Sequence, residues 1–130
     1  MSDPMAAVVK GVVAAVSADA AIRALSGDPV RIWDAAPRGA VFPHLVIGGG
    51  NWRETAAGFE VELSLSAVSR FDGQEEAREL AGAVRGALEG LALSQDGMAG
   101  RVAVRSVEVF AGADRRHAYG VVRLRAVMEG

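Results

Sequence analysis

The 130-residue chain is long enough for one compact domain that removes roughly two-thirds of its unfolded surface from water, and we expect a single domain over residues 1–130. Apolar residues make up 51% of the chain and aromatic residues 5%, which argues against disorder and leaves few large side chains for a small-molecule pocket. A net charge of -2 argues against a protein that mainly neutralises phosphates, and the absence of cysteine excludes disulfides and thiolate metal sites.

The N-terminal segment predicts a helix with a break. Asp3 followed by Pro4 is a favourable start, because the carboxylate caps free N–H groups and proline fits the first turn. Valines recur at three- and four-residue spacing from Val8 to Val16, which indicates one buried stripe. Asp19 offers a second cap, so we expect one broken helix or two short ones that end at Gly27.

The next segment predicts short extended pieces and then one long strand. Residues 30–33 and His44–Ile47 are expected to be short strands. Three glycines follow, and because glycine costs conformational entropy and packs no side chain, Gly48–Gly58 is predicted to be a long mobile loop. From Phe59 to Ala67, apolar residues alternate with glutamate and serine, which is typical of a strand with one buried and one exposed face.

The C-terminal half predicts a helix and a β-hairpin. Asp72 and Glu75 resemble a capping box, and an apolar stripe at helical spacing predicts a helix from about Gly73 to Leu88. Residues 101–110 and 119–128 are expected to be paired strands, with a β-bulge near Arg105 where the alternation slips by one residue. The fold class predicted is α+β: a mainly antiparallel β-sheet with α-helices packed on one face and a closing β-hairpin.

No residue pattern indicates catalysis, a cofactor or a metal. The two histidines have no metal-ligand spacing, so we expect His44 to pack at a strand start and His117 to be solvated in a loop. No serine lies in a nucleophile elbow, and the glycine run lacks the lysine of a P-loop. The glutamates near the start of the predicted helix are expected to form a solvated face, and they are Glu75, Glu76 and Glu79. We therefore expect no enzyme activity and no catalytic, cofactor-binding or metal-binding residues.

Four arginines gather on one face of the predicted hairpin: Arg101, Arg105, Arg123 and Arg125. Like charges opposite one another are destabilising unless acidic groups counter them. Glu60 and Glu62, on the polar face of the long strand, are candidates for this role, in the same subunit or a neighbour. Arginine stems that reach water, and a face that binds duplex DNA, are the alternatives.

A series of short segments follows in a fixed order along the chain: Arg31-Ile32-Trp33-Asp34, Pro37, Gly39-Ala40, Phe42–Ile47, Phe59-Glu60-Val61, Ser69–Gly73, Glu76-Ala77 and Ala83-Val84-Arg85. Read in this order, the segments resemble the tail-terminator (tail-completion) family of long-tailed phages and gene-transfer particles. The resemblance implies a structural subunit of a ring, six subunits in the family, at the head-proximal end of the tail tube. It implies a tail-tube protein and a head-side stopper protein as partners, with DNA only as cargo passing through the lumen.

The interface residues are expected around Trp52 and around Arg115. The full set comprises Trp52, Arg53, Glu54, Glu60, Glu62, Arg105, Arg115, Arg116, Arg123 and Arg125. The N-terminus lacks the pattern of a signal peptide, and no apolar stretch reaches the roughly 20 residues of a membrane span. We therefore expect synthesis in the bacterial cytoplasm, assembly in the neck of the particle and no membrane contact. Another neck component such as a stopper, and a small α+β binding or regulatory domain, remain alternative functions.

Overall fold

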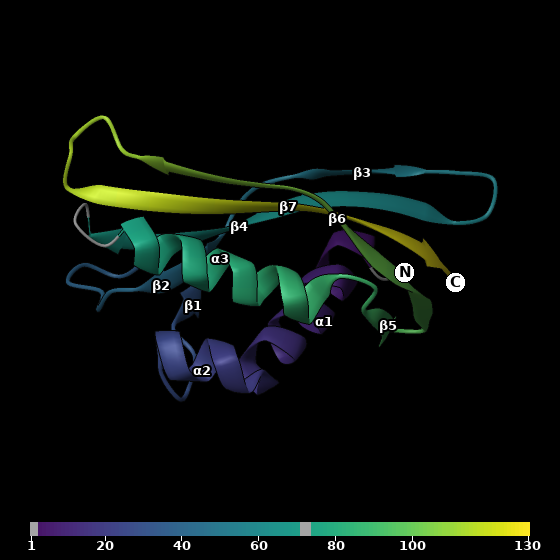
Figure 1. The fold of residues 1–130 in the computed structure, drawn as a ribbon. Coiled ribbons are helices and arrows are strands. Elements are labelled where there is room, and N and C mark those ends of the chain that lie inside the picture. Colours follow the sequence, from purple (N-terminus) through teal and green to yellow (C-terminus); the bar gives the residue numbers. More distant parts are fainter. Residues whose placement is uncertain (1–2, 71–73) are drawn as a thin grey trace.

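The chain folds into a long, curled β-sheet with helices beneath it (Figure 1). The computed structural model describes residues 3–70 and 74–130. The helices within these residues are α1 (Pro4–Ala18), α2 (Ala20–Ser26) and α3 (Gln74–Leu88). The strands are β1 (Ile32–Trp33), β2 (His44–Ile47), β3 (Asn51–Glu54), β4 (Phe59–Arg70), β5 (Ala92–Gln95), β6 (Met98–Ala111) and β7 (His117–Glu129). The predicted α+β class is confirmed.

The sheet has the strand order β1-β2-β4-β7-β6-β5, and β3 pairs with the part of β4 that β2 leaves uncovered. Every pair is antiparallel except β1 with β2. β4 and β7 form the centre and pair along their length, from Phe59 opposite Met128 to Arg70 opposite His117. The closing hairpin is β6–β7, and its register shifts between Val104 and Ser106, so the predicted bulge at Arg105 is confirmed.

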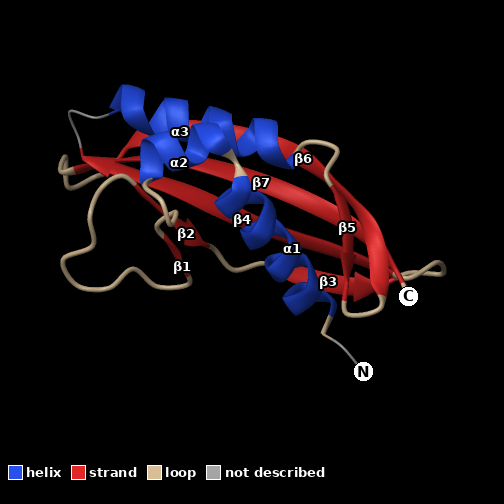
Figure 2. Cartoon of the chain, turned by 90° about the horizontal axis from the view of Figure 1, so that it is seen from below, coloured by secondary structure: helices blue, strands red, loops and turns tan. Residues whose placement is uncertain are grey.

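The three helices lie on one side of the sheet, as two perpendicular views show (Figure 1, Figure 2). α3 directs Leu80, Val84 and Leu88 into the same core cluster as the inward-facing residues of β4, namely Val61, Leu63 and Leu65. This packing confirms the predicted stripe and leaves the other face of the sheet without a helical cover. No single helix in the described ranges is long and apolar enough to span a membrane; α1 and α2 together pass by length and composition, but they are bent by 80°.

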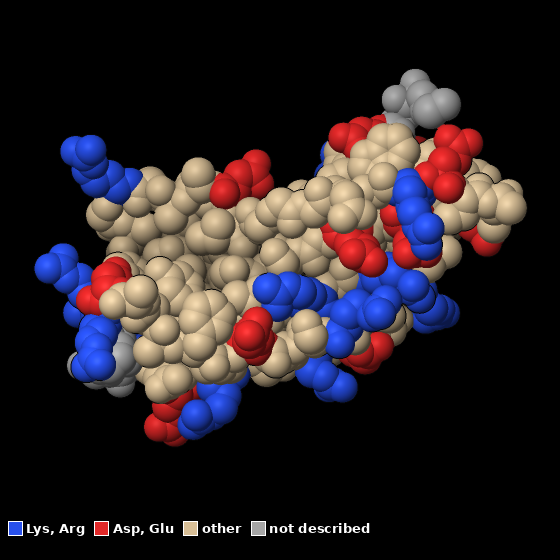
Figure 3. All heavy atoms as spheres, turned by 90° about the horizontal axis from the view of Figure 1, so that it is seen from above, with Lys and Arg blue, Asp and Glu red and all other residues tan. Residues whose placement is uncertain are grey.

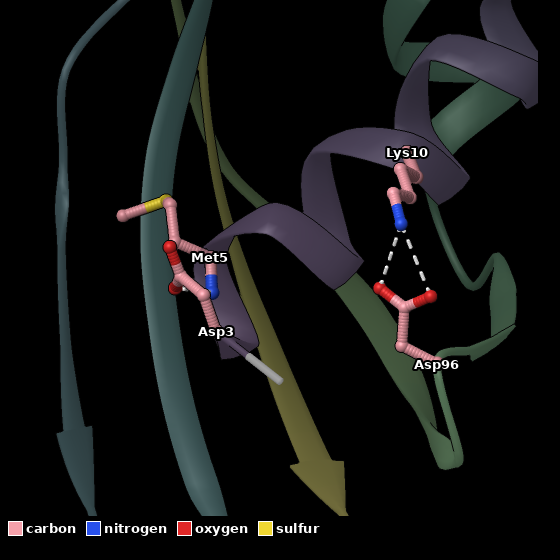
Figure 4. Close-up of polar contacts among 4 residues, drawn as sticks. All are labelled: Asp3, Met5, Lys10 and Asp96. Carbon is pink, nitrogen blue, oxygen red and sulfur yellow. Dashed lines mark hydrogen bonds and ion pairs between the residues drawn. The ribbon is translucent and has the colours of Figure 1, made fainter. Parts of the chain in front are cut away.

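The N-terminal helices begin and end where the sequence predicts. The Asp3 carboxylate accepts a hydrogen bond from the Met5 N–H at 2.9 Å, and Asp19 caps α2 by accepting from Ile22 N–H at 3.0 Å. Lys10 on α1 donates to both carboxylate oxygens of Asp96, at 3.1 and 3.0 Å, and so connects α1 to the turn between β5 and β6 (Figure 4).

The prediction that Gly48–Gly58 form a long mobile loop is wrong. Asn51–Glu54 form strand β3, and the backbone turns back into β4 through a hydrogen bond from Thr55 N–H to Gly58 C=O at 2.7 Å. The glycines serve close approach here, because a Cβ atom on Gly50 would collide with the backbone of Glu62 on β4. The glycine run therefore marks where one strand lies tightly against another.

Strand β5 is a further difference, because no strand was predicted at residues 92–95. It forms a hairpin with β6 through Asp96 and Gly97, which both have positive φ angles of 54° and 81°. An Asp-Gly pair is a strong signal for a two-residue β-turn, and the sequence reasoning did not use it. The proposed cap at Asp72 lies outside the described residues.

Candidate functional site

The uncovered face of the sheet carries a mixed cluster of charged side chains. Because side chains alternate along a strand, Glu60 and Glu62 point away from the helices, and on β7 Arg123 and Arg125 do the same. Seen from this side, basic and acidic groups intermingle over one half of the face, whereas the other half is uncharged in its middle and carries charged groups along its margin (Figure 3). The sheet therefore presents two chemically different halves.

Glu60 contacts two arginines in the charged half. Its carboxylate accepts hydrogen bonds from Arg53 Nη2 on β3 at 3.2 and 3.3 Å, and Arg125 Nη1 on β7 lies 3.6 Å away. The Glu60 side chain is only 18% exposed, whereas the Arg53 side chain is 71% exposed. Glu60 was expected to compensate the arginine face from the same subunit or from a neighbour, and it does so for Arg125 within the same subunit.

The remaining arginines of this face have different environments. Arg123 Nη1 donates to Glu108 Oε1 at 3.1 Å, and Glu62 lies directly opposite Arg125 in the strand register. Arg125 has one buried atom, Nε, without a hydrogen-bond partner among the described residues. Arg101 was expected in the same cluster, but its Nη1 donates to the Gly90 carbonyl at 3.0 Å, which holds it beside the end of α3.

An open hollow of about 320 Å³ lies beside this cluster, and its wall combines glycine backbone with charged groups. It is lined by Gly49, Gly50, Asn51, Glu62, Leu63, Ser64, Arg105, Arg123 and Leu124. Arg105 has no hydrogen bond or ion pair to another described residue, so its charge is available to a partner. The hollow therefore brings together three of the predicted interface residues: Glu62, Arg105 and Arg123.

The other predicted interface residues lie elsewhere. Trp52 and Glu54 are on β3 but on the helix side, because Trp52 pairs with the buried Val61. Trp52 is 45% exposed, and its ring meets the Phe59 ring edge-on at 5.5 Å between centroids. Trp52 is thus half-packed on its own subunit and half-exposed.

Arg115 and Arg116 lie in the β6–β7 turn, and β7 separates this turn from the residues next to β3. At about 3.3 Å per residue, the two ends of β7 are roughly 40 Å apart. In the turn, Asp114 accepts from Arg116 N–H at 3.0 Å and contacts His117 Nδ1 at 3.1 Å, and these interactions lower the Asp114 pKa, the Arg116 N–H most strongly. The predicted interface set therefore lies in two separate regions, one on and beside β3 and one at the β6–β7 turn.

A cluster of aromatic rings borders the uncharged half of the face. His44 packs between Trp33 and Phe42, at 5.5 and 5.0 Å between ring centroids, and its Nδ1 donates to the Val41 carbonyl at 3.0 Å. Burial lowers the pKa of His44 below its ordinary value of 6.5, and the bond to Val41 only partly offsets this effect. His44 packs at its strand start as predicted.

His117 differs from the prediction of a solvated loop residue. It begins β7, is half-buried, and stacks on Phe42 at 5.3 Å between ring centroids. Glu76 also differs from the predicted solvated face, because it is partly buried and accepts a hydrogen bond from Ser69 Oγ at 3.0 Å. Among the described residues, no group of three or more His, Cys, Asp or Glu side chains is placed to hold a metal ion.

Glu108 is a residue of the charged cluster that the sequence reasoning missed. The alternation along β6 contained the information needed to predict it. Beyond the bulge at Arg105, the even-numbered residues of β6 lie opposite the odd-numbered residues of β7. Glu108 then lies on the same face as Arg123 and diagonally next to it. The arrangement as a whole is suited to contacts with another protein, because it offers paired charges, an unpaired arginine and exposed apolar side chains on a rigid sheet.

Comparisons with known proteins give two findings. Residues 10–129 match the family model for tail completion protein gp17. Among solved structures, a chain of the "virion of native gene transfer agent (GTA) particle" is similar with a TM-score of 0.85, and the match covers 99% of this chain and 100% of that chain. The two sequences are 21% identical, so this likeness shows a shared fold. A search of curated proteins found no match.

Proposed function

This chain belongs to the tail completion protein gp17 family, and from that membership we propose that it is a ring subunit that terminates the tail tube and joins the tail to the head-side neck. The particle would be a long-tailed phage or a gene-transfer particle. The observation that carries the proposal is the family match over residues 10–129, which leaves only the first nine residues and the last one outside it. In this role residues 1–130 act as one domain, and no enzymatic step is required.

Two features of the molecule support a role in assembly. One face of the sheet has no helix over it and carries charged groups in an alternating pattern of sign, which is typical of a surface that orients a partner. Exposed apolar side chains lie at the sheet edges, including Trp52 on β3 and Val107 on β6. A head-to-tail contact between such surfaces closes into a ring when its rotation divides a full turn.

The partners proposed are further copies of this chain in a ring of six, a tail-tube protein and a head-side stopper protein. DNA would pass through the lumen as cargo, since a net charge of -2 does not favour tight phosphate binding. The protein would be made in the bacterial cytoplasm and assembled at the head-proximal end of the tail. The contact residues proposed are Trp52, Arg53, Glu54, Glu60, Glu62, Arg105, Arg115, Arg116, Arg123 and Arg125.

Removal of the gene from a particle-producing strain tests this function. Electron microscopy should reveal over-long tails that are not attached to heads, and a plasmid copy of the gene should restore joined particles. Tails of normal length that stay unattached would contradict tube termination and indicate a stopper. Joined, infectious or transfer-competent particles in the deletion strain would overturn the proposal as a whole.

A further inference from the structure

Strand β6 has an unpaired outer edge over its second half. β5 covers only Met98–Arg101, and residues 90 and 91 hydrogen-bond to Val102. Beyond that point, the only hydrogen bond to this edge among the described residues runs from Val104 N–H to the Glu89 carboxylate at 3.3 Å. Val107 and Phe110 on the uncovered part are each 40% exposed. Exposed edges of this kind are a liability for uncontrolled pairing, and here the edge lacks lysine and proline that would block it.

Strand β3 provides a second unpaired edge, on the opposite side of the same sheet. It pairs with β4 on one side only, and all four of its residues, Asn51–Glu54, are exposed. The two edges have opposite strand directions, because the order β3, β4, β7, β6 is antiparallel at every step. A copy of the molecule rotated about a ring axis would therefore place its β3 antiparallel to the β6 of its neighbour.

The backbone groups on the two edges have matching phase. In an antiparallel pair, hydrogen-bonded and non-hydrogen-bonded positions alternate. The bond from Thr55 N–H to Gly58 C=O means that Trp52 and Glu54 direct their backbone groups away from β4. The bond from Gly112 N–H to His117 C=O likewise means that Val107 and Val109 direct theirs away from β7. Trp52 opposite Val109 would then be a hydrogen-bonded pair.

We propose that β3 of one copy pairs antiparallel with the free edge of β6 in the next copy, with Trp52 opposite Val109 and Arg53 opposite Glu108. This inference rests on the proposed ring and names its subunit contact. In that register Arg53 meets Glu108 on the uncovered face, and Trp52 covers Val107 and Val109 on the helix face. Shifts of two residues keep the backbone phase but place Arg53 opposite Ser106 or Phe110, so charge selects the register.

The proposed register shifts each copy along the strand direction relative to its neighbour, and a closed sheet can accommodate a shift of this size. Within one copy, Arg53 lies opposite Glu60, Glu60 lies opposite Val127, and Val127 lies opposite Arg101 on β6. The proposed partner of Arg53 is Glu108 and not Arg101. At about 3.3 Å per residue, and after one residue is subtracted for the bulge, Glu108 lies about 20 Å along β6 from Arg101. Four strand spacings of about 4.8 Å separate successive copies of β3, or about 19 Å. The strands would thus tilt by about 45°, at the upper end of the 35–45° of closed sheets.

Engineered cysteines test the contact, because the chain has no cysteine of its own. In the double variant Arg53→Cys/Glu108→Cys, the two thiols of neighbouring copies would lie within disulfide range, since Cα atoms of a non-hydrogen-bonded pair are about 4.5 Å apart. A disulfide within one copy is impossible, because β4 and β7 lie between the two strands. Mild oxidation should produce a ladder of covalent multimers on denaturing gels. The control Arg53→Cys/Val109→Cys keeps Trp52 and places the two thiols on opposite faces of the sheet, so it should give at least tenfold less crosslinked product.

A proline variant gives a second readout. Val109→Pro removes the N–H that points away from β7 and should abolish the oligomer in native mass measurements. The monomer should still fold, because edge strands tolerate proline where the N–H faces solvent. Ser94→Pro on β5 is the matched control and should leave the oligomer intact. Oligomers without the Arg53–Glu108 crosslink, or crosslinking of Glu108→Cys alone into dimers, would overturn this contact and leave the ring itself standing. Monomers throughout, with and without tail tubes, would overturn both.

Discussion

Gly50 lies so close to Glu62 that a Cβ atom at position 50 would collide with the backbone carbonyl of Glu62. Glycine here allows β3 to lie against β4, so we predict that Gly50→Ala destabilises the protein by about 1–3 kcal/mol, as overpacking does. Gly49→Ala is the matched control, because a Cβ atom there would meet nothing within 4 Å. Denaturant melts give the free energy of unfolding of both variants. Equal stability of the two variants would contradict a close approach at Gly50.

Leu80 is the clearest core position on α3. It is fully buried and belongs to the cluster that joins α3 to β4 and β7. Leu80→Ala should lower the free energy of unfolding by about 2–5 kcal/mol, because it removes buried carbon atoms and leaves a cavity. Glu79→Ala, on the exposed side of the same helix, should change it by less than about 0.5 kcal/mol. A small loss at Leu80 in denaturant melts would show that the helix does not pack as described.

The elements with strong periodicity were predictable from sequence. The stripe through Leu80 and the alternation from Phe59 both specify which face is buried, and the structure has these elements within one to three residues of the expected bounds. Asp3 and Asp19 were predictable for a different reason, since a capping carboxylate acts on backbone within three residues. Local interactions, in short, could be read from the chain directly.

The errors share a physical cause. Whether Gly50 marks a loop or a close contact depends on Glu62, twelve residues away, and the glycine itself carries no sign of that neighbour. A cluster of arginines with acidic partners was predictable, because like charges on one face require compensation. The pairing of Arg123 with Glu108 was not, because it depends on the exact position of the bulge.

Glu60 holds two arginines, so its removal should affect the sheet. We predict that Glu60→Gln lowers the free energy of unfolding by about 1 kcal/mol, because Arg125 would lose a charged neighbour while its Nε atom is already buried without a partner. Glu62→Gln is the control, since Glu62 is exposed and makes no ion pair within 4 Å of a described cation. Higher salt should reduce the difference between the variants, and a salt-independent difference would contradict an ionic origin.

The stability of the protein should fall in mild acid because of His44. Burial lowers the pKa of His44 in the folded protein, so the unfolded chain binds its proton more readily. The folded state is therefore fully favoured above the ordinary pKa of 6.5 and loses stability as the pH falls from there to the lowered value. His44→Gln should reduce this slope in melting temperatures recorded from neutral pH to about pH 5. An unchanged slope would assign the pH dependence to other groups.

Trp52 should contribute more to assembly than to folding. Trp52 is 45% exposed, and among the described residues its ring meets one other aromatic ring, that of Phe59, so Trp52→Ala should cost folding only about 1 kcal/mol. An interface tryptophan that becomes buried commonly contributes about 2 kcal/mol or more, so the same variant should weaken subunit association at least about 30-fold and fail to cap tail tubes. Val41→Ala is the control, because Val41 is 61% exposed and lies outside β3, in the loop between β1 and β2. Sedimentation and thermal melts of the two variants separate the roles. If Trp52→Ala instead melts at a markedly lower temperature while its oligomers persist, then Trp52 is a core residue and the contact between copies lies elsewhere.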